Sequence, residues 1–353
     1  MSLQGLRKVR VADDFRAIFS DMYGRGFTDG LPVIPPTEDL VREMLDHASL
    51  DPGEIIAVIA PDDEPLSVAK AAINAVMAGC LPEYFPVVIA AVKAVTAPRF
   101  NLLGIQTTTN PVAPVLVING PVRELLDINC GRGCMGPGKR ANATIGRALN
   151  LILVNIGGAT PRTVDKSIHG MPGKFTFCFG ELEDESPWEP LHAEKGFRSE
   201  QSTVTAFGGQ GTHNVVAAYH DMTNVAHMLA DAMCCYGNNS YHVGHGNPLV
   251  VINPGHARGF AQMGWDKKRL KQELFERTKV PRSYIPAERL FLESVWNDQK
   301  SDEYCTLCKE VDDINIVVAG GPEAYHICYI PSFGHTALST AEIVLPQKAI
   351  PQP

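Results

Sequence analysis

The fold class is indicated most clearly by the segment Asn110-Pro-Val-Ala-Pro-Val-Leu-Val-Ile-Asn119-Gly-Pro121. Its apolar run, which ends at Asn119, is typical of a buried strand. The glycine-rich segment Asn129–Gly138 follows, and a helix with one apolar face is expected from Lys139 to about Ile156. A strand, a loop and an amphipathic helix in this order predict an α/β fold with mixed sheets flanked by helices.

The segment Asn247-Pro-Leu-Val-Val-Ile-Asn253-Pro-Gly255 repeats this pattern. The repetition is consistent with two related α/β lobes, but buried strand–helix units often look alike without any such relation. We expect an N-terminal lobe over residues 1–200 and a C-terminal lobe over residues 201–353. Other expected elements are strands over 203–207 and 314–319, a long helix over 212–235 and an acidic surface loop over 181–202.

The composition is that of an acidic globular protein, with 353 residues, 45% hydrophobic residues and a formal net charge of -8. Such a chain without a long Lys/Arg run is a poor candidate for binding nucleic acid or an anionic membrane. The N-terminal residues lack the apolar core of a secretory signal. An odd number of cysteines, nine, favours reduced thiols, so a cytoplasmic protein is expected.

Uncharged polar residues are concentrated in three segments, 100–122, 201–220 and 232–257. None of them contains Asp, Glu, Lys or Arg, yet all are rich in Thr, Asn, Gln, His and Gly. Solvated loops usually carry charge, and buried polar groups need partners. At least two of these segments are therefore expected to line one pocket, with Thr107, Thr108 and Asn119 as candidate substrate-binding residues.

The glycine-rich segment is a second candidate site. Its glycines leave the N–H groups at the start of the next helix accessible, and a guanidinium lies beside them, so we expect it to bind an anion. The same field would favour the thiolate of Cys134, which makes Cys134 a further candidate catalytic residue. The alternative is a tight loop that packs against a sheet. The candidate substrate contacts in this segment are Cys130, Gly136, Gly138, Arg140 and Asn142.

Cys80 lies just before Pro82, where a helix is expected to begin. The field of that helix would lower the pKa of the thiol, which makes Cys80 a candidate nucleophile or metal thiolate. Glu83 is the nearest titratable group and the candidate acid or base. The alternative is a cysteine that acts as a small buried hydrophobic residue.

Histidines suggest a further hypothesis. His213, His220 and His227 are seven apart on the expected helix, so they share a face, but successive ones are too distant for two of them to bind one ion. His242 and His245 lie in a nearby glycine-rich loop. A site for one transition-metal ion would use His213 with His242 and His245; the alternative is that each histidine is hydrogen-bonded separately.

Several stretches together resemble a bacterial family associated with small proteins that carry a UGSC motif (selenocysteine or cysteine, Gly, Ser, Cys). The resemblance implies a redox or thiol context, and it draws attention to Cys80, Glu83, Arg140 and Asn142 as polar members of the shared motifs. The chain itself has no UGSC tetrad. The resembling stretches are Asp29-Gly-Leu-Pro-Val-Ile-Pro-Pro-Thr37, Asn74-Ala-Val-Met-Ala-Gly-Cys-Leu-Pro-Glu83, Gly136-Pro-Gly-Lys-Arg-Ala-Asn-Ala-Thr-Ile-Gly-Arg147, Ser186-Pro-Trp-Glu-Pro190 and Gly320-Gly-Pro322.

These features predict a small-molecule enzyme that uses an activated cysteine and an anion-binding loop on an anionic or carbonyl-bearing substrate. Two alternatives stay open: a metal-dependent lyase or hydrolase with histidine ligands, and a non-catalytic subunit that partners a UGSC-type protein. We also expect the chain to form a homo-oligomer.

Overall fold

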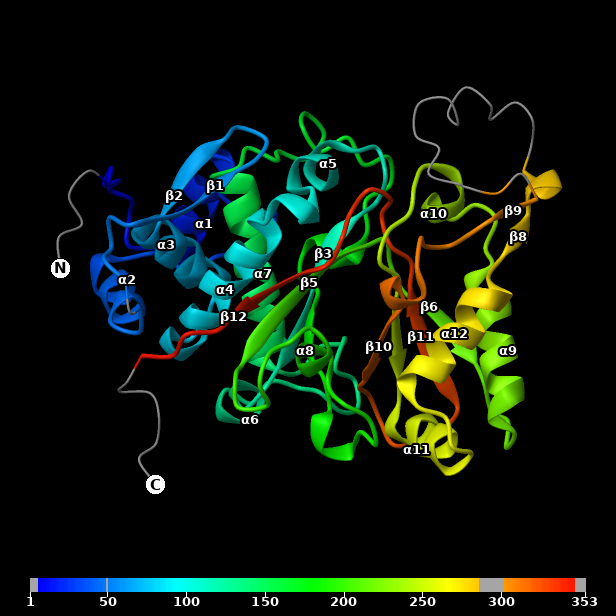
Figure 1. Ribbon diagram of the computed structural model, residues 1–353. Helices are drawn as coiled ribbons and strands as arrows, with labels where there is room; N and C mark the ends of the chain where they lie inside the picture. The colour runs from blue at the N-terminus through cyan, green and yellow to red at the C-terminus, as the bar shows by residue number, and fades with distance from the viewer. Residues whose placement is uncertain (1–5, 49, 286–300, 302, 347–353) are drawn as a thin grey trace.

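The computed structural model describes residues 6–48, 50–285, 301 and 303–346. It confirms the α/β class, because two four-stranded mixed sheets lie at the centre and helices cover their outer faces (Figure 1). The first sheet has the order β12 (Ser339–Glu342), β5 (Thr203–Gly209), β3 (Ala113–Asn119), β4 (Cys178–Gly180). The second has the order β10 (Asn315–Val318), β7 (Leu249–Ile252), β11 (His326–Ile330), β6 (His213–Val216).

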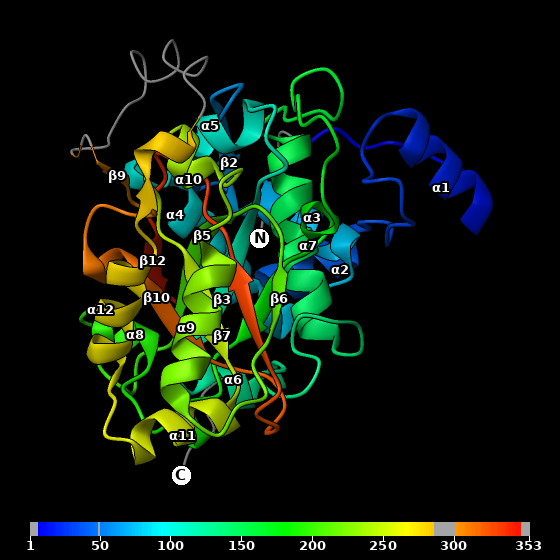
Figure 2. The ribbon, with the colours of Figure 1, turned by 90° about the vertical axis from the view of Figure 1, so that its right-hand side faces the viewer.

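The sheets pack against each other, so the molecule has four layers. Along β3, Val115 and Val117 belong to the apolar cluster between the sheets, whereas Leu116 and Ile118 belong to the cluster beneath the helices. Residues of β7 alternate in the same way, as expected for a strand with both faces buried. The first sheet is covered by α4 (Phe85–Thr96) and α7 (Arg140–Asn155), against which α3 (Val68–Ala78) packs (Figures 1 and 2). The second is covered by α9 (Met222–Met233) and α12 (Lys267–Arg277), and α11 (Pro254–Gln262) packs against α9.

Both sheets have the same internal arrangement. The central strands β3 and β7 each pair in parallel with one neighbour, β4 or β10, and antiparallel with the other, β5 or β11. An outer antiparallel strand, β12 or β6, completes each sheet. Asn119 is the last residue of β3, and Asn253 directly follows β7. The two segments of the expected repeat therefore occupy equivalent positions in the two sheets.

Two chain segments pass from one sheet to the other. β5 leads into β6 and β11 leads into β12, and the two crossings are joined by a bridge between Gly209 and Ser332. The expected lobe boundary between residues 200 and 201 is therefore wrong. Strands β5 and β12 lie after this boundary in the sequence, yet both belong to the first sheet. The C-terminal strand thus completes the N-terminal lobe.

Most expected helices and strands are present, but the helix expected over 212–235 is wrong over residues 212–221. Residues His213–Val216 form strand β6, which pairs with β11, and helix α9 begins only at Met222. The side chain of Asp221 caps it by accepting a hydrogen bond from the N–H of Thr223. The three histidines spaced by seven residues therefore do not share a helix.

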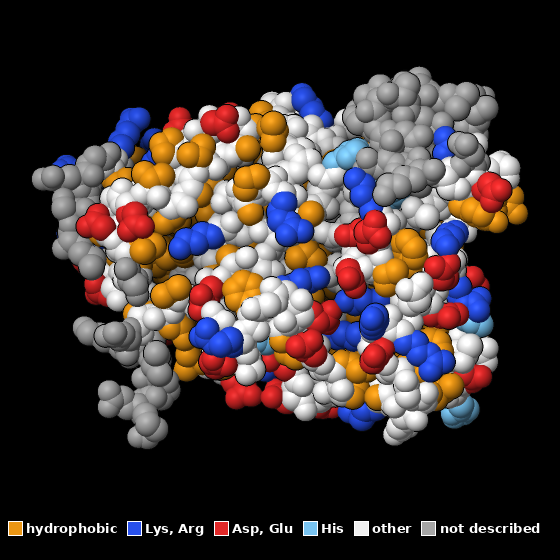
Figure 3. All heavy atoms as spheres, in the orientation of Figure 1, with side chains coloured by type: hydrophobic (Ala, Val, Ile, Leu, Met, Phe, Trp, Pro, Cys, Tyr) orange, Lys and Arg blue, Asp and Glu red, His pale blue; other side chains and the backbone are white. Residues whose placement is uncertain are grey.

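The surface differs between the lobes. On the face shown in Figure 3, apolar side chains are frequent over the first lobe, and charged side chains gather over the second. Helix α1 (Phe15–Gly24) stands away from the body and buries none of its side chains (Figure 2). Within the described ranges no single helix is long and apolar enough to cross a membrane; the pair 82–96 and 98–107 passes that test together, but it is bent by 70°.

Candidate functional site

A pocket of about 610 Å³ lies between the lobes, beside the crossing segments. Two of the three uncharged polar segments line it, which confirms that such segments converge on one pocket. No charged side chain is among the described residues of its wall. The lining residues are Asn101, Gly104, Thr107, Thr108, Thr109, Asn110, Pro111, Ile168, His169, Asn239, Val243, Phe333, Gly334 and His335. We call this the inter-lobe pocket.

Two strained residues hold the rim of the inter-lobe pocket. Asn101 has φ 54° and His335 has φ 58°, both in the left-handed region that costs most residues free energy. The Asn101 side chain donates from Nδ2 to the His335 carbonyl at 3.2 Å and accepts at Oδ1 from the N–H of Gly104 at 3.2 Å. These bonds join helix α5 (Leu102–Thr107) to the β11–β12 crossing.

The opposite side of the rim is fixed in the same manner. The His335 ring donates from Nε2 to the carbonyl of Val243 at 3.1 Å, since a carbonyl oxygen can only accept. The N–H of Gly334 donates to Oδ1 of Asn239 at 2.6 Å. Strained residues cluster at functional sites, where the surrounding structure holds them in place. The rim of the inter-lobe pocket is therefore pre-organised from both lobes.

The predicted residues Thr107 and Thr108 lie in this wall. The Thr107 hydroxyl donates to the Leu103 carbonyl at 2.8 Å, and Oγ1 of Thr108 accepts from the N–H of Asn110 at 3.1 Å. Each hydroxyl keeps hydrogen-bonding capacity, as acceptor for Thr107 and as donor for Thr108. Oδ1 of Asn110 is buried and has no partner among the described residues. The wall thus offers neutral donors and acceptors.

Cys80 and Arg140 lie near each other at a different place, the junction of α3 and α7, and Glu83 lies in the short turn Pro82–Tyr84 just before α4. The Cys80 thiol donates to the Thr144 carbonyl at 3.3 Å, and Nε of Arg140 donates to the carbonyl of Gly79 at 2.9 Å. Burial raises the pKa of Cys80 to about 12, in spite of the nearby arginines. The expectation of a thiolate at Cys80 is therefore corrected: loss of hydration outweighs the favourable charges.

The glycine-rich segment closes against the second lobe. Its predicted substrate contact Asn142 positions the loop instead: its Oδ1 accepts from the N–H of Asn129 at 2.8 Å, and its Nδ2 donates to the carbonyls of Asn129 and Cys134 at 3.0 and 3.1 Å. Burial raises the pKa values of Cys130 and Cys134 to about 11, so both thiols are protonated at neutral pH. The expected thiolate at Cys134 is thus corrected as well.

The start of α7 keeps the feature that suggested an anion site. Gly136 and Gly138 are exposed, Lys139 gives no side-chain cap, and within the described chain nothing accepts from the N–H of Arg140. The first N–H groups of a helix have no intrahelical partner. Lys139 itself pairs with Asp127. Anion binding here stays a prediction.

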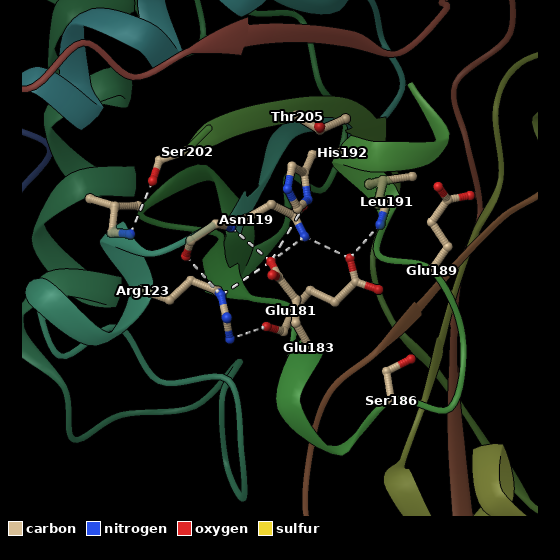
Figure 4. A network of polar contacts seen from close by, with 12 residues as sticks. Asn119, Arg123, Glu181, Glu183, Ser186, Glu189, Leu191, His192, Ser202 and Thr205 are labelled. Atoms are coloured by element: carbon tan, nitrogen blue, oxygen red, sulfur yellow. Dashed lines mark hydrogen bonds and ion pairs between the residues drawn. The ribbon is translucent and has the colours of Figure 1, made fainter. Parts of the chain in front are cut away.

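Asn119, at the end of β3, lies in a buried network of charged groups rather than in a pocket (Figure 4). Its Nδ2 donates to Oε2 of Glu181 at 2.7 Å and to Oε1 of Glu183 at 2.9 Å. Arg123 pairs with the Glu183 carboxylate at 3.1 Å, and His192 lies 3.9 Å from it. Both ring nitrogens of the fully buried His192 lack a hydrogen-bond partner among the described residues.

The expected acidic surface loop over 181–202 is right for exposed acids such as Glu185 and Glu200, but wrong for Glu181. Glu181 follows β4 directly and is fully buried, and its Oε1 lies 3.6 Å from Nζ of Lys267 on α12. Glu194 pairs with both Lys267 and Lys271, at 2.5 and 2.6 Å. Glu181 and Glu194 are thus matched by lysines of α12 in the second lobe, whereas Glu183 pairs with Arg123 of the first lobe. These buried acids are not identified by the sequence analysis. The one feature that points to them is the position of two glutamates just after an apolar strand.

The predicted metal ligands do not come together. His213 lies on the exposed strand β6, the ring of His242 bonds the carbonyl of Tyr236, and Nε2 of His245 lies 3.0 Å from Oγ1 of Thr306. No group of three or more His, Cys, Asp or Glu side chains in the described ranges is arranged to hold a metal ion. The residues present do not fit the hypothesis of one transition-metal ion bound by these histidines.

No protein-family model and no curated protein matches the sequence. The resemblance to the family associated with UGSC-motif proteins therefore stays an expectation, and function has to be argued from the site itself.

Proposed function

We propose that this protein is a small-molecule enzyme whose substrate, a neutral carbonyl- or amide-bearing compound, binds in the inter-lobe pocket. The observation that carries the proposal is the convergence of uncharged polar side chains from both lobes on one pre-organised pocket. Ligand pockets use a few fixed polar groups to orient a ligand within an otherwise preformed cavity. The volume of about 610 Å³ suits a small metabolite.

The chemistry of the wall supports a neutral substrate. A charged ligand would leave its hydration without meeting an opposite charge in the described lining, which is costly. Threonine and asparagine side chains instead match a carbonyl, hydroxyl or amide group. His169 and His335 are the titratable side chains of the described wall, so the reaction class that fits best is proton transfer at a carbonyl-bearing substrate.

The cysteine-dependent reaction ranks lower on physical grounds. No cysteine is among the described residues of the inter-lobe pocket, and Cys80, Cys130 and Cys134 are buried and protonated. Partnership with a UGSC-type protein, a cytoplasmic location and homo-oligomer formation stay predictions.

Equilibrium dialysis against a defined mixture of small polar metabolites, followed by mass spectrometry, tests the proposal. The wild-type chain should retain one or more neutral carbonyl or amide compounds. Thr108→Trp, which fills the pocket, should retain none of them, whereas the control Thr223→Trp on α9 should behave as wild type. Retention that is equal in all three proteins, or absent from the wild type, would reject this function.

A further inference from the structure

A second pocket, of about 720 Å³, lies between α7, the start of β3 and the loop over residues 158–175. It shares two wall residues, Ile168 and His169, with the inter-lobe pocket. The N–H of Ile168 donates to the Thr109 carbonyl at 3.0 Å, which anchors this shared wall. The two pockets are therefore neighbours, and the segment after α5 contributes to both. We call the second one the lateral pocket.

The lateral pocket is lined by polar side chains that lack partners in the described chain. Gln106 is 7% exposed, and its Nε2 is buried without a hydrogen-bond acceptor. A buried amide N–H left unsatisfied costs free energy, which an oxygen of a ligand would recover. Neither the Asn150 amide on α7 nor the Arg162 guanidinium makes a hydrogen bond or an ion pair with the described residues.

The charge of this pocket is positive once its ion pairs are taken into account. Asp29 is held by Arg147 through two bonds, of 2.7 and 2.8 Å, and Asp165 pairs with Lys174 at 2.6 Å. The carboxylates in the wall are thus neutralised, and the guanidinium of Arg162 is left over. A guanidinium presents parallel N–H groups that match a carboxylate.

Hydrogen bonds hold the backbone of the loop that carries Arg162. Arg162 has φ 73°, a left-handed conformation that costs an arginine free energy. Its N–H donates to the carbonyl of Asp165 at 3.1 Å, and the N–H groups of Val164 and Asp165 both donate to the carbonyl of Thr160. The side chain of Asp165 accepts from the N–H of Ser167 at 3.0 Å. These contacts fix the backbone at Arg162, whose exposed side chain is part of the pocket wall.

We propose that the lateral pocket binds the carboxylate of a small organic acid that also carries a neutral oxygen, such as a hydroxy or oxo acid. Arg162 takes the carboxylate, and the amide N–H groups of Gln106 and Asn150 donate to the neutral oxygen. This inference goes beyond the proposed reaction in the inter-lobe pocket and does not depend on it.

Titration calorimetry with lactate, a hydroxy acid, and with its neutral analogue lactamide tests the inference. The wild-type chain should bind lactate and bind lactamide at least about tenfold more weakly, because the charge-assisted pair with Arg162 is lost. Arg162→Gln and Gln106→Leu should each weaken lactate binding by about tenfold or more. Arg16→Gln, an exposed arginine on α1, is the matched control and should leave it unchanged.

Three results would overturn the inference: no lactate binding by the wild type, equal affinity for the acid and its amide, or undiminished binding by Arg162→Gln. Undiminished binding by Gln106→Leu would equally overturn the assigned role of the amide. Failure of the inter-lobe pocket to retain neutral compounds would not affect these outcomes, so the two proposals fail separately.

Discussion

Replacing Glu181 by glutamine should destabilise the whole molecule, because this carboxylate joins the two lobes from inside. Its Oε2 accepts from Nδ2 of Asn119 at 2.7 Å and from the N–H of Leu191 at 2.8 Å. Its Oε1 accepts from the N–H of Val318, at the end of β10, at 3.4 Å. Glu181→Gln keeps the shape of the side chain but turns one acceptor into a donor that faces existing donors.

The expected loss follows from these contacts. A hydrogen bond to a charged group contributes about 1.5–3 kcal/mol net, and breaking a buried ion pair costs about 3–5 kcal/mol. Lys267 keeps Glu194 at 2.5 Å, so its charge is not left without a partner. Glu181→Gln should therefore lower the free energy of unfolding by about 3 kcal/mol, near the lower end of the range for breaking a buried ion pair.

Equilibrium urea unfolding, followed by circular dichroism, measures this loss. Glu185→Gln is the matched control, since Glu185 is 49% exposed in its pair with Arg258 and should cost less than about 0.5 kcal/mol. A loss below about 1 kcal/mol for Glu181→Gln, or equal losses in both variants, would refute the argument that burial makes this contact important.

Three other predictions follow from particular side chains. Burial lowers the pKa of His256 below 6.5, and Asn253 and the Ala217 carbonyl hold its ring, so at low pH the unfolded chain binds a proton that the folded chain does not. The free energy of unfolding, measured with urea, should therefore fall as the pH is lowered from about 7.5 to about 5.5, and His256→Gln should lose this pH dependence. Iodoacetamide at neutral pH should label the exposed Cys235 well before the buried, protonated thiols of Cys80, Cys130 and Cys134. Peptide mass spectrometry measures the order of labelling. Early labelling of Cys80 would restore the thiolate mechanism. Asn142→Ala removes the hydrogen bonds that hold the loop over 129–134 and should lower the free energy of unfolding by about 2–3 kcal/mol. Proteolytic cleavage in this loop should be faster than in wild type, whereas the control Asn224→Ala on α9 should leave the cleavage rate unchanged.

Local patterns in the sequence predicted the elements that short-range physics determines. The apolar run before Asn119 is β3, and the periodic residues after Lys139 form the buried face of α7. Thr107 and Thr108 were identified as pocket residues because charge is absent over a long polar stretch, which is also a local property.

The predictions that are wrong concern residues whose structure depends on distant parts of the chain. β6 is a strand because it pairs with β11, more than a hundred residues later, and nothing near His213 reveals that partner. Glu181 is buried because Asn119 and Lys267 supply its partners from other elements. The protonated state of Cys80 likewise follows from the depth at which α3 and α7 bury it, and a helix start in the sequence does not give that depth.

A crystal structure of the wild-type chain, grown with the compound that it retains in dialysis, locates the substrate-binding site. We expect density for that compound between Thr107–Asn110 and the rim at Gly334 and His335, with its carbonyl or amide within hydrogen-bond distance of the wall. Density for it at Cys80 and the start of α7, with the inter-lobe pocket empty, would show that the substrate site is not the inter-lobe pocket.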